Sequence, residues 1–213
     1  MQPKPEFAGN PDGIFSTPIH KHQAIFDDNI DLQKEAKWLL GKIEQKGFEK
    51  HQGWEHDVHS LSDPTFQENV LRKHRALKLI NFIMRETNVY LSRLGHSQKE
   101  TGLRDINIVS SWLTKTMPGE YARLHDHGTT DVAGVYYIKA NPNTDGNIYF
   151  QDHDKVKTHG QLLRAVPYQH DIPPSEGCLV LFPGWLTHGV RVHRGTEPRV
   201  SLSFNITFKT DLG

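Results

Sequence analysis

The second half of the chain alternates apolar and polar residues over short stretches, and this pattern constrains the fold more than any other feature. In residues 199–208 (RVSLSFNITF), every second residue is apolar. Successive side chains of a β-strand point to opposite faces of a sheet, so this segment predicts a strand with one apolar and one polar face. Gly, Pro and Asn turns separate it from the other expected strands, which are residues 106–116, 121–127, 132–140, 147–151 and 178–182.

Helical periodicity precedes these strands. Residues 31–46 place apolar side chains on one helical face, and Gly47 is suited to ending that helix. A second helical block extends from a cap at Asp63 to Gly95 and covers one helix or two. Helices followed by a run of antiparallel strands predict an α+β fold, namely a double-stranded β-helix (jelly roll) with the N-terminal helices packed on one sheet.

Length and charge suit a single domain that acts on small or peptidic molecules. We expect one domain over residues 1–213, with a helical N-terminal part (1–105) and a jelly-roll core (106–210). The 25 basic and 25 acidic residues balance, so nothing indicates nucleic acid or a membrane surface as a partner. No apolar run approaches the roughly 20 residues that span a bilayer. The only cysteine is Cys178, which excludes an internal disulfide, and we expect a cytoplasmic protein.

Three histidines of the β-region are candidate metal ligands. Imidazoles two residues apart on a strand point to the same face, so His125 and His127 can bind one metal ion, which His188 can complete from a neighbouring strand. The chain has 14 histidines, so some such pairs arise by chance. The apolar strand and Pro-Gly turn before His188 favour the metal interpretation. The pair His20-x-His22 has the same spacing but no evident partner, and we interpret it as coincidental.

The polar face of the last strand is the second candidate binding feature. It carries Arg199, Ser201, Ser203 and Asn205. A guanidinium on an inward face needs a carboxylate or phosphate for its forked donors, because an unpaired buried charge is very costly. Ser201 can add a hydroxyl donor to the same anion. The alternative is a structural arginine paired with a nearby Asp or Glu, but the proximity to His188 favours ligand binding.

The order of these motifs resembles that of the 2-oxoglutarate and Fe(II)-dependent oxygenases, particularly uncharacterised members from bacteria and phages. The matching pieces are His125-x-His127, GVYYI, GNIYFQD, GCLVLFPGWLTH ending at His188, and Arg199-x-Ser201. They extend over residues 106–208, and the upstream GIFSTPI is also similar to the start of that subfamily.

The resemblance implies a chemistry as well as a fold. Such enzymes bind Fe(II) on two histidine-bearing strands, use 2-oxoglutarate and O2, and hydroxylate a substrate with release of succinate and CO2. By position, Arg199, Ser201 and Tyr137 would bind the distal carboxylate of 2-oxoglutarate, although strand packing explains Tyr137 equally well. No catalytic side chain beyond the metal ligands is implied. The substrate would be a peptidyl residue, as in prolyl-hydroxylase-like relatives, or a small molecule, and residues 152–174 are long enough to form a lid.

One position departs from the family pattern. The usual triad is His-x-Asp followed by a distal His, whereas this chain has His127 where the Asp would stand. Asp126 alternates to the opposite strand face and could ligate only if a bulge turned it. Asp131 could fold back past Gly128, but a turn-capping role is more ordinary. Three neutral imidazoles leave Fe(II) with its full charge, which the dianion 2-oxoglutarate would compensate.

Two other functions fit parts of the pattern. Glycines before each histidine motif fit much of the two cupin motifs, which imply a metal-dependent dioxygenase or isomerase without 2-oxoglutarate. The Arg199-x-Ser201 motif argues against that function. The other alternative is a non-catalytic jelly-roll binding module held by structural zinc. Such zinc sites normally have a fourth ligand, commonly Cys. The only cysteine, Cys178, lies in an apolar predicted core strand, so this alternative is the least favoured.

Overall fold

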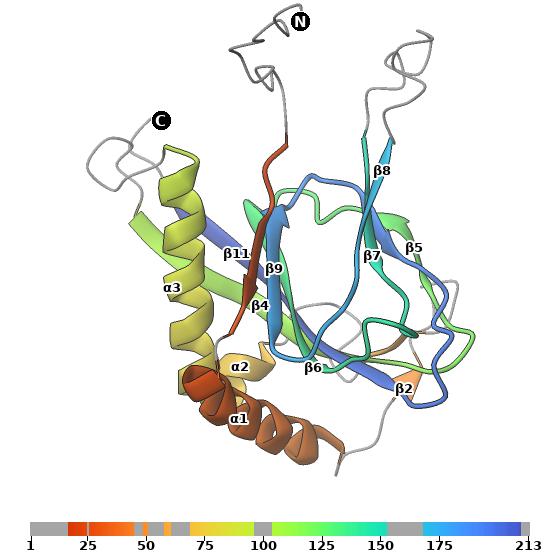
Figure 1. Ribbon diagram of the computed structural model, residues 1–213. Helices are drawn as coiled ribbons and strands as arrows, with labels where there is room; N and C mark the ends of the chain where they lie inside the picture. The colour runs from red at the N-terminus through yellow and green to blue at the C-terminus, as the bar shows by residue number, and fades with distance from the viewer. Residues whose placement is uncertain are drawn as a thin grey trace, which may run out of the picture.

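Two antiparallel β-sheets and a layer of helices make up the described part of the protein (Figure 1). The computed structural model describes residues 17–24, 26–44, 49–50, 58–60, 69–95, 104–152 and 168–209. Its helices are α1 (Phe26–Glu44), α2 (Val70–Lys73) and α3 (Leu77–Arg93). Its strands are β1 (His20–Gln23), β2 (Glu49–Lys50), β3 (Val58–Ser60), β4 (Arg104–Thr116), β5 (Ala122–His125), β6 (Val132–Lys139), β7 (Ile148–Gln151), β8 (Gln169–Ile172), β9 (Cys178–Pro183), β10 (His188–Val190) and β11 (Arg199–Lys209).

The strands form a double-stranded β-helix. The larger sheet has the order β1-β9-β6-β11-β4-β3-β2, and the smaller sheet has the order β5-β10-β7-β8. Neighbouring strands in both sheets are antiparallel. Helices α1 and α3 pack on the outer face of the larger sheet, on the left in Figure 1. The predicted α+β jelly roll with helices on one sheet is therefore confirmed.

Strand β11 separates two apolar cores, as its alternating sequence predicts. Val200, Leu202, Phe204 and Ile206 belong to the core between the larger sheet and the helices. A second core lies between the sheets and draws its side chains from β6, β7, β8 and β9. The polar residues of β11 face this second side, where they lie beside the space between the sheets. Burial of one face of β11 therefore sets its register, because a slip of one residue would turn every polar side chain into the helical core.

The helices differ from the prediction mainly at their starts. Helix α1 begins at Phe26 rather than at residue 31, because the apolar periodicity behind the prediction starts only at Leu32. The second helical block is two helices, α2 and α3, and a turn that contains Arg75 at φ 55° joins them. Asn69 caps α2 by accepting a hydrogen bond from the amide of Arg72, while the predicted cap Asp63 lies outside the described residues.

One end of the expected lid and the end of one strand also differ from the prediction. Residues 169–172 are strand β8, paired with β7, so this end of the segment 152–174 belongs to the smaller sheet. Residues 153–167 of that segment lie outside the described residues. Strand β5 ends at His125, so His127 follows the strand instead of lying within it.

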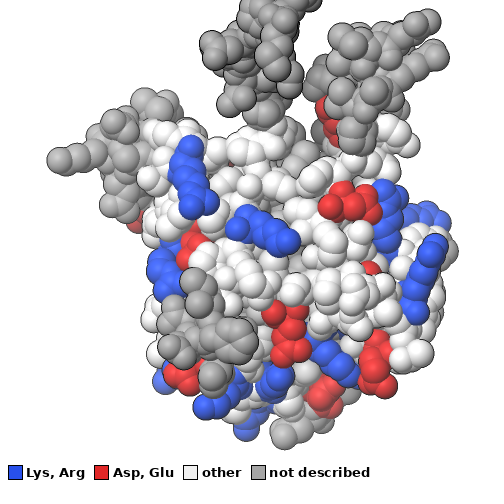
Figure 2. Space-filling model, viewed as in Figure 1, with Lys and Arg blue, Asp and Glu red and all other residues white. Residues whose placement is uncertain are grey.

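The face of the molecule in Figure 2 shows acidic and basic side chains interspersed. Charged side chains are also paired across elements, such as Lys78 of α3 with Asp31 of α1 at 2.7 Å. No helix in the described part of the chain is long and apolar enough to span a bilayer.

Candidate metal and cosubstrate site

The three predicted histidines meet at one end of the smaller sheet. His125 of β5 and His188 of β10 are directly paired across the strands, and His127 follows two residues after His125. The ring centre of His188 lies 4.4 Å from that of His125 and 5.0 Å from that of His127. One ligand atom from each ring lies within 4.8 Å of the others, which is close enough for one metal ion.

Each of the three rings is held through its Nδ1 atom by an oxygen acceptor. The Nδ1 atoms lie 2.8 Å from the carbonyl of Arg123 for His125 and 2.9 Å from the carbonyl of Leu186 for His188. The Nδ1 atom of His127 lies 2.5 Å from Oδ1 of Asn205. A neutral imidazole that donates its Nδ1 proton presents a lone pair at Nε2, the form in which histidine ligates metals.

Aromatic side chains enclose these histidines and keep them neutral. Phe182 lies with its ring centre 4.6 Å from that of His188, and Trp112 stacks on His127 at 5.9 Å. Burial lowers the pKa of His127 to about 4, although the hydrogen bond that its ring donates to Asn205 opposes this shift. Burial also lowers the pKa of His125 and, more strongly, that of His188. Protons therefore compete little with a metal ion at neutral pH.

A close contact between two turns places His127 beyond the end of β5. The amide of His127 donates to the carbonyl of Gly184 at 2.8 Å. A Cβ atom at Gly184 would lie 2.0 Å from the carbonyl oxygen of Thr130, so this approach requires glycine. The Pro-Gly turn noted in the sequence therefore also supports a metal-site histidine.

The two aspartates near the site have other partners. Asp126 accepts a hydrogen bond from the amide of Gly128 at 2.9 Å, and Asp131 accepts one from the amide of Phe208 at 2.9 Å. Among the described residues, the group of potential ligands around His127 contains no carboxylate. Cys178 is fully buried in the core between the sheets and is also not part of that group.

Arg199 is a buried cation with neutral partners. Its side chain donates to the carbonyl of Gly146 at 2.9 Å and to Oγ1 of Thr116 at 3.1 Å, while its Nε atom has no hydrogen-bond partner. None of the ion pairs found in the described ranges involves Arg199, which is 3% exposed. Burial lowers the pKa of Arg199, and the nearby Tyr137 and Asp145 oppose this effect. A buried guanidinium of this kind is suited to an anionic ligand.

Tyr137 and Ser201 lie beside Arg199 on the same face. Ser201 of β11 is paired with Tyr137 of β6 on one side and with Thr114 of β4 on the other. The Tyr137 ring centre lies 5.9 Å from the Arg199 guanidinium carbon. Burial raises the pKa of Tyr137 to about 12, so its hydroxyl keeps its proton and can donate to an anion. Tyr136 precedes Tyr137 on β6 and faces the helical core, because successive side chains of a strand point to opposite faces.

Residues 110–205 match a family model described as "Putative 2OG-Fe(II) oxygenase". The match extends from β4 to β11 and contains the three histidines, Tyr137, Arg199 and Ser201. Over these residues the chain is similar to the 2OG-Fe(II) oxygenases. This oxygenase family uses Fe(II), 2-oxoglutarate and O2, and the match argues against the cupin and structural-zinc alternatives.

Solved structures share the oxygenase fold at low sequence identity. A prolyl-4-hydroxylase from Pseudomonas putida is 18% identical, with a TM-score of 0.56 and coverage of 90% of this chain and 92% of the other. The viral collagen prolyl hydroxylase vCPH from Paramecium Bursaria Chlorella virus-1 is 16% identical, with a TM-score of 0.54 and coverage of 88% and 94%. HygX from Streptomyces hygroscopicus, with nickel, 2-oxoglutarate and hygromycin B bound, is 11% identical, with a TM-score of 0.52 and coverage of 89% and 82%. No curated protein matches the chain.

Sequence reasoning missed the groups that hold the site residues in place. Asn205 was placed on the polar face of the last strand, but its contact with His127 joins residues 78 positions apart. Thr116 and Gly146, which hold Arg199, gave no signal of their own because they act through tertiary contacts.

Proposed function

We propose that His125, His127 and His188 bind the Fe(II) of this oxygenase as a three-histidine set. The observation that carries this proposal is the convergence of three neutral imidazoles, each oriented through Nδ1 by an oxygen acceptor. When bound, the iron supplies the activation of O2. The protein holds the ligands rigid, and the aromatic side chains around them limit the access of water.

Arg199, Ser201 and Tyr137 are the proposed binding groups for the distal carboxylate of 2-oxoglutarate. The unpartnered Nε atom of Arg199 supports this assignment, because a carboxylate would supply the missing acceptor. The dianionic cosubstrate would also compensate the charge that three neutral ligands leave on the metal.

The proposed reaction is hydroxylation of a peptidyl residue or a small molecule, with release of succinate and CO2. Fold similarity to prolyl hydroxylases over most of their length supports a peptidyl substrate. Similarity to HygX, whose structure contains hygromycin B, keeps a small-molecule substrate as the alternative. Succinate formation, measured with proline-containing peptides and separately with candidate small molecules, distinguishes the two substrate classes. The true substrate should also gain the mass of one oxygen atom, which mass spectrometry measures.

Anaerobic titration with Fe(II) followed by 2-oxoglutarate tests the site. The wild-type protein should develop the visible metal-to-ligand charge-transfer band of a chelated cosubstrate, and His188→Ala should lose iron while remaining folded. Arg199→Lys should bind iron normally but bind 2-oxoglutarate about ten- to a hundredfold more weakly, because an ammonium cannot replace two forked donors. Arg191→Lys is the matched control, since Arg191 pairs with Asp171 outside the site. Unchanged 2-oxoglutarate binding by Arg199→Lys would contradict the cosubstrate assignment.

A further inference from the structure

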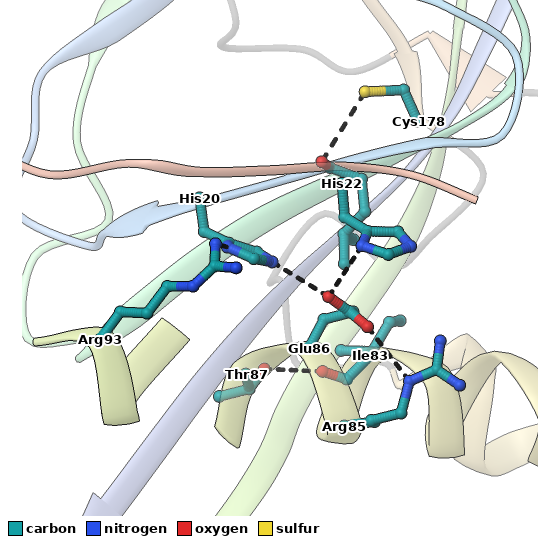
Figure 3. A network of polar contacts seen from close by, with 9 residues as sticks. His20, His22, Ile83, Arg85, Glu86, Thr87, Arg93 and Cys178 are labelled. Atoms are coloured by element: carbon teal, nitrogen blue, oxygen red, sulfur yellow. Dashed lines mark hydrogen bonds and ion pairs between the residues drawn. The ribbon is translucent and has the colours of Figure 1, made fainter. Parts of the chain in front are cut away.

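A second cluster of metal-ligating side chains joins strand β1 to helix α3. His20 and His22 extend from β1 toward Glu86 of α3 (Figure 3). One ligand atom from each of these three residues lies within 4.8 Å of the others. The sequence pattern His20-x-His22 was interpreted as coincidental because it lacked a partner, and the fold supplies that partner from a distant helix.

This cluster is separate from the oxygenase site. Strand β1 pairs with β9, and His20 and His22 stand opposite Leu181 and Leu179. Residues directly opposite on antiparallel strands share a face of the sheet. Both leucines belong to the core on the helix side, so the cluster lies on the face opposite the space between the sheets, where His188 is located.

The donor atoms are arranged around one carboxylate oxygen. Oε2 of Glu86 lies 3.0 Å from Nε2 of His20 and 3.1 Å from Nδ1 of His22. Donors to a tetrahedral metal at about 2.1 Å are roughly 3.4 Å apart, so an ion needs only small shifts of these side chains to enter. Arg85 binds the other oxygen of Glu86 at 3.1 Å. Burial disfavours ionisation, but hydrogen bonds from His20 and Arg85 outweigh it and keep the pKa of Glu86 below its usual value.

We propose that His20, His22 and Glu86 form a second metal site, which takes a divalent transition ion of the Zn(II) or Co(II) type. Two imidazoles and one carboxylate match the nitrogen and oxygen ligands of these ions and not the all-oxygen sites of Ca(II) or Mg(II). The side chain of Glu86 is 5% exposed, whereas that of His22 is 28% exposed and gives solvent access for the ion and a fourth ligand, water. The bound ion fastens β1 to α3.

Arg93 gives the proposal a distinctive signature. Its guanidinium lies 3.3 Å from Nδ1 of His20 and can only donate, so it favours the proton on Nε2, which faces Glu86. Metal binding through Nε2 requires that proton to leave and the exposed Arg93 to turn away. Removing Arg93 should therefore strengthen metal binding, whereas it would weaken a network built only of hydrogen bonds.

Titration of the full-length protein with Co(II) tests this site independently of the oxygenase site. In the His188→Ala background, one Co(II) should still bind and show the intense visible bands of four-coordinate cobalt. Adding Glu86→Gln or His22→Ala should abolish that binding, while adding Arg93→Ala should tighten it severalfold. Adding His170→Ala, which removes an exposed histidine of β8, is the control and should change nothing.

Thermal melting of the same variants gives a second readout. Co(II) should raise the melting temperature of His188→Ala but not that of His188→Ala with Glu86→Gln, because only the first can be stabilised by binding at the cluster. Circular dichroism establishes that each variant is folded. Absence of four-coordinate Co(II) in His188→Ala, or its persistence in folded variants that lack Glu86 or His22, would overturn the proposal.

Discussion

At the scale of single residues, hydrogen-bond partners separate the proposed iron ligands from the residues that orient those ligands. Asn205 belongs to the second group, since its Oδ1 atom holds Nδ1 of His127. Hydrogen-bond partners also separate Arg199 from Asp131. Arg199 is held by neutral groups and is free to bind an anion, whereas Asp131 is occupied by the amide of Phe208.

Asn205→Ala should weaken iron binding without unfolding the protein. Loss of the acceptor frees the ring of His127 to rotate and to change tautomer, which typically costs about ten- to a hundredfold in metal affinity. Competition with a chelator of known affinity measures this effect. Asn205→Asp retains an acceptor oxygen and should restore binding, whereas a metal affinity in Asn205→Ala equal to that of the wild type would exclude an orienting role.

Asp131→Ala should reduce stability and leave iron binding unchanged. Its carboxylate accepts the amide proton of Phe208, and loss of this acceptor should lower the free energy of unfolding by about 1 to 2 kcal/mol. Chemical denaturation measures the stability, and chelator competition measures the iron affinity. A variant that folds but no longer binds iron would show that Asp131 is a ligand.

At the scale of elements, β6, β11 and β4 lie side by side in the larger sheet. One face of this sheet packs on the helices, and the other carries the polar side chains of β11. Gly134 of β6 is paired with Phe204 of β11 on one side and with Leu181 of β9 on the other. A Cβ atom there would lie 2.4 Å from the ring of Phe204 and 2.7 Å from Leu181. The side chains of Phe204 and Leu181 therefore occupy the space over Gly134, which is open only because this residue lacks a side chain.

Gly134→Ala should destabilise the protein by about 1 to 3 kcal/mol, because the added methyl group overpacks a filled core. Gly41→Ala is the matched control, since nothing lies within 4 Å of a Cβ at Gly41 of helix α1. Alanine favours the helical conformation, so this change should stabilise the protein by up to about 1 kcal/mol. Denaturant titrations compare the two, and equal effects of both variants would contradict the packing argument.

At the scale of the whole molecule, the fold keeps three imidazoles neutral in a largely apolar setting. Their pKa values fall because enclosure between the two sheets removes the water that would stabilise the charged form. The unfolded chain has no such enclosure, and its histidines titrate near about 6.5. Stability and metal binding therefore both depend on pH through the same groups.

The free energy of unfolding of the metal-free protein should fall as the pH decreases from about 6.5 toward 4, the pKa of His127 in the folded chain. In this range the unfolded chain binds protons that the folded chain excludes, so acid favours unfolding. Each such histidine contributes a slope of at most about 1.4 kcal/mol per pH unit. Melting curves at several pH values measure the slope. His127→Gln should have a shallower slope, and an unchanged slope would contradict this assignment.

The sequence by itself determined the features that depend on local periodicity and on chain order. The alternation in residues 199–208 predicted which side chains of β11 face the core, because a strand exposes successive residues on opposite faces whatever surrounds it. The motif order led to the oxygenase family, which the family match confirms. The histidines, Arg199, Ser201 and Tyr137 are brought to one side of the larger sheet, but their binding roles stay predictions.

Only the tertiary structure decided which distant residues complete each site. His127 meets Asn205 across 78 positions, and His20 meets Glu86 across 66. The spacing of His20-x-His22 contains no information about a helix that packs over β1 from elsewhere in the chain. Such partners are set by strand order and helix packing, which depend on the burial of the whole apolar surface and not on any local pattern.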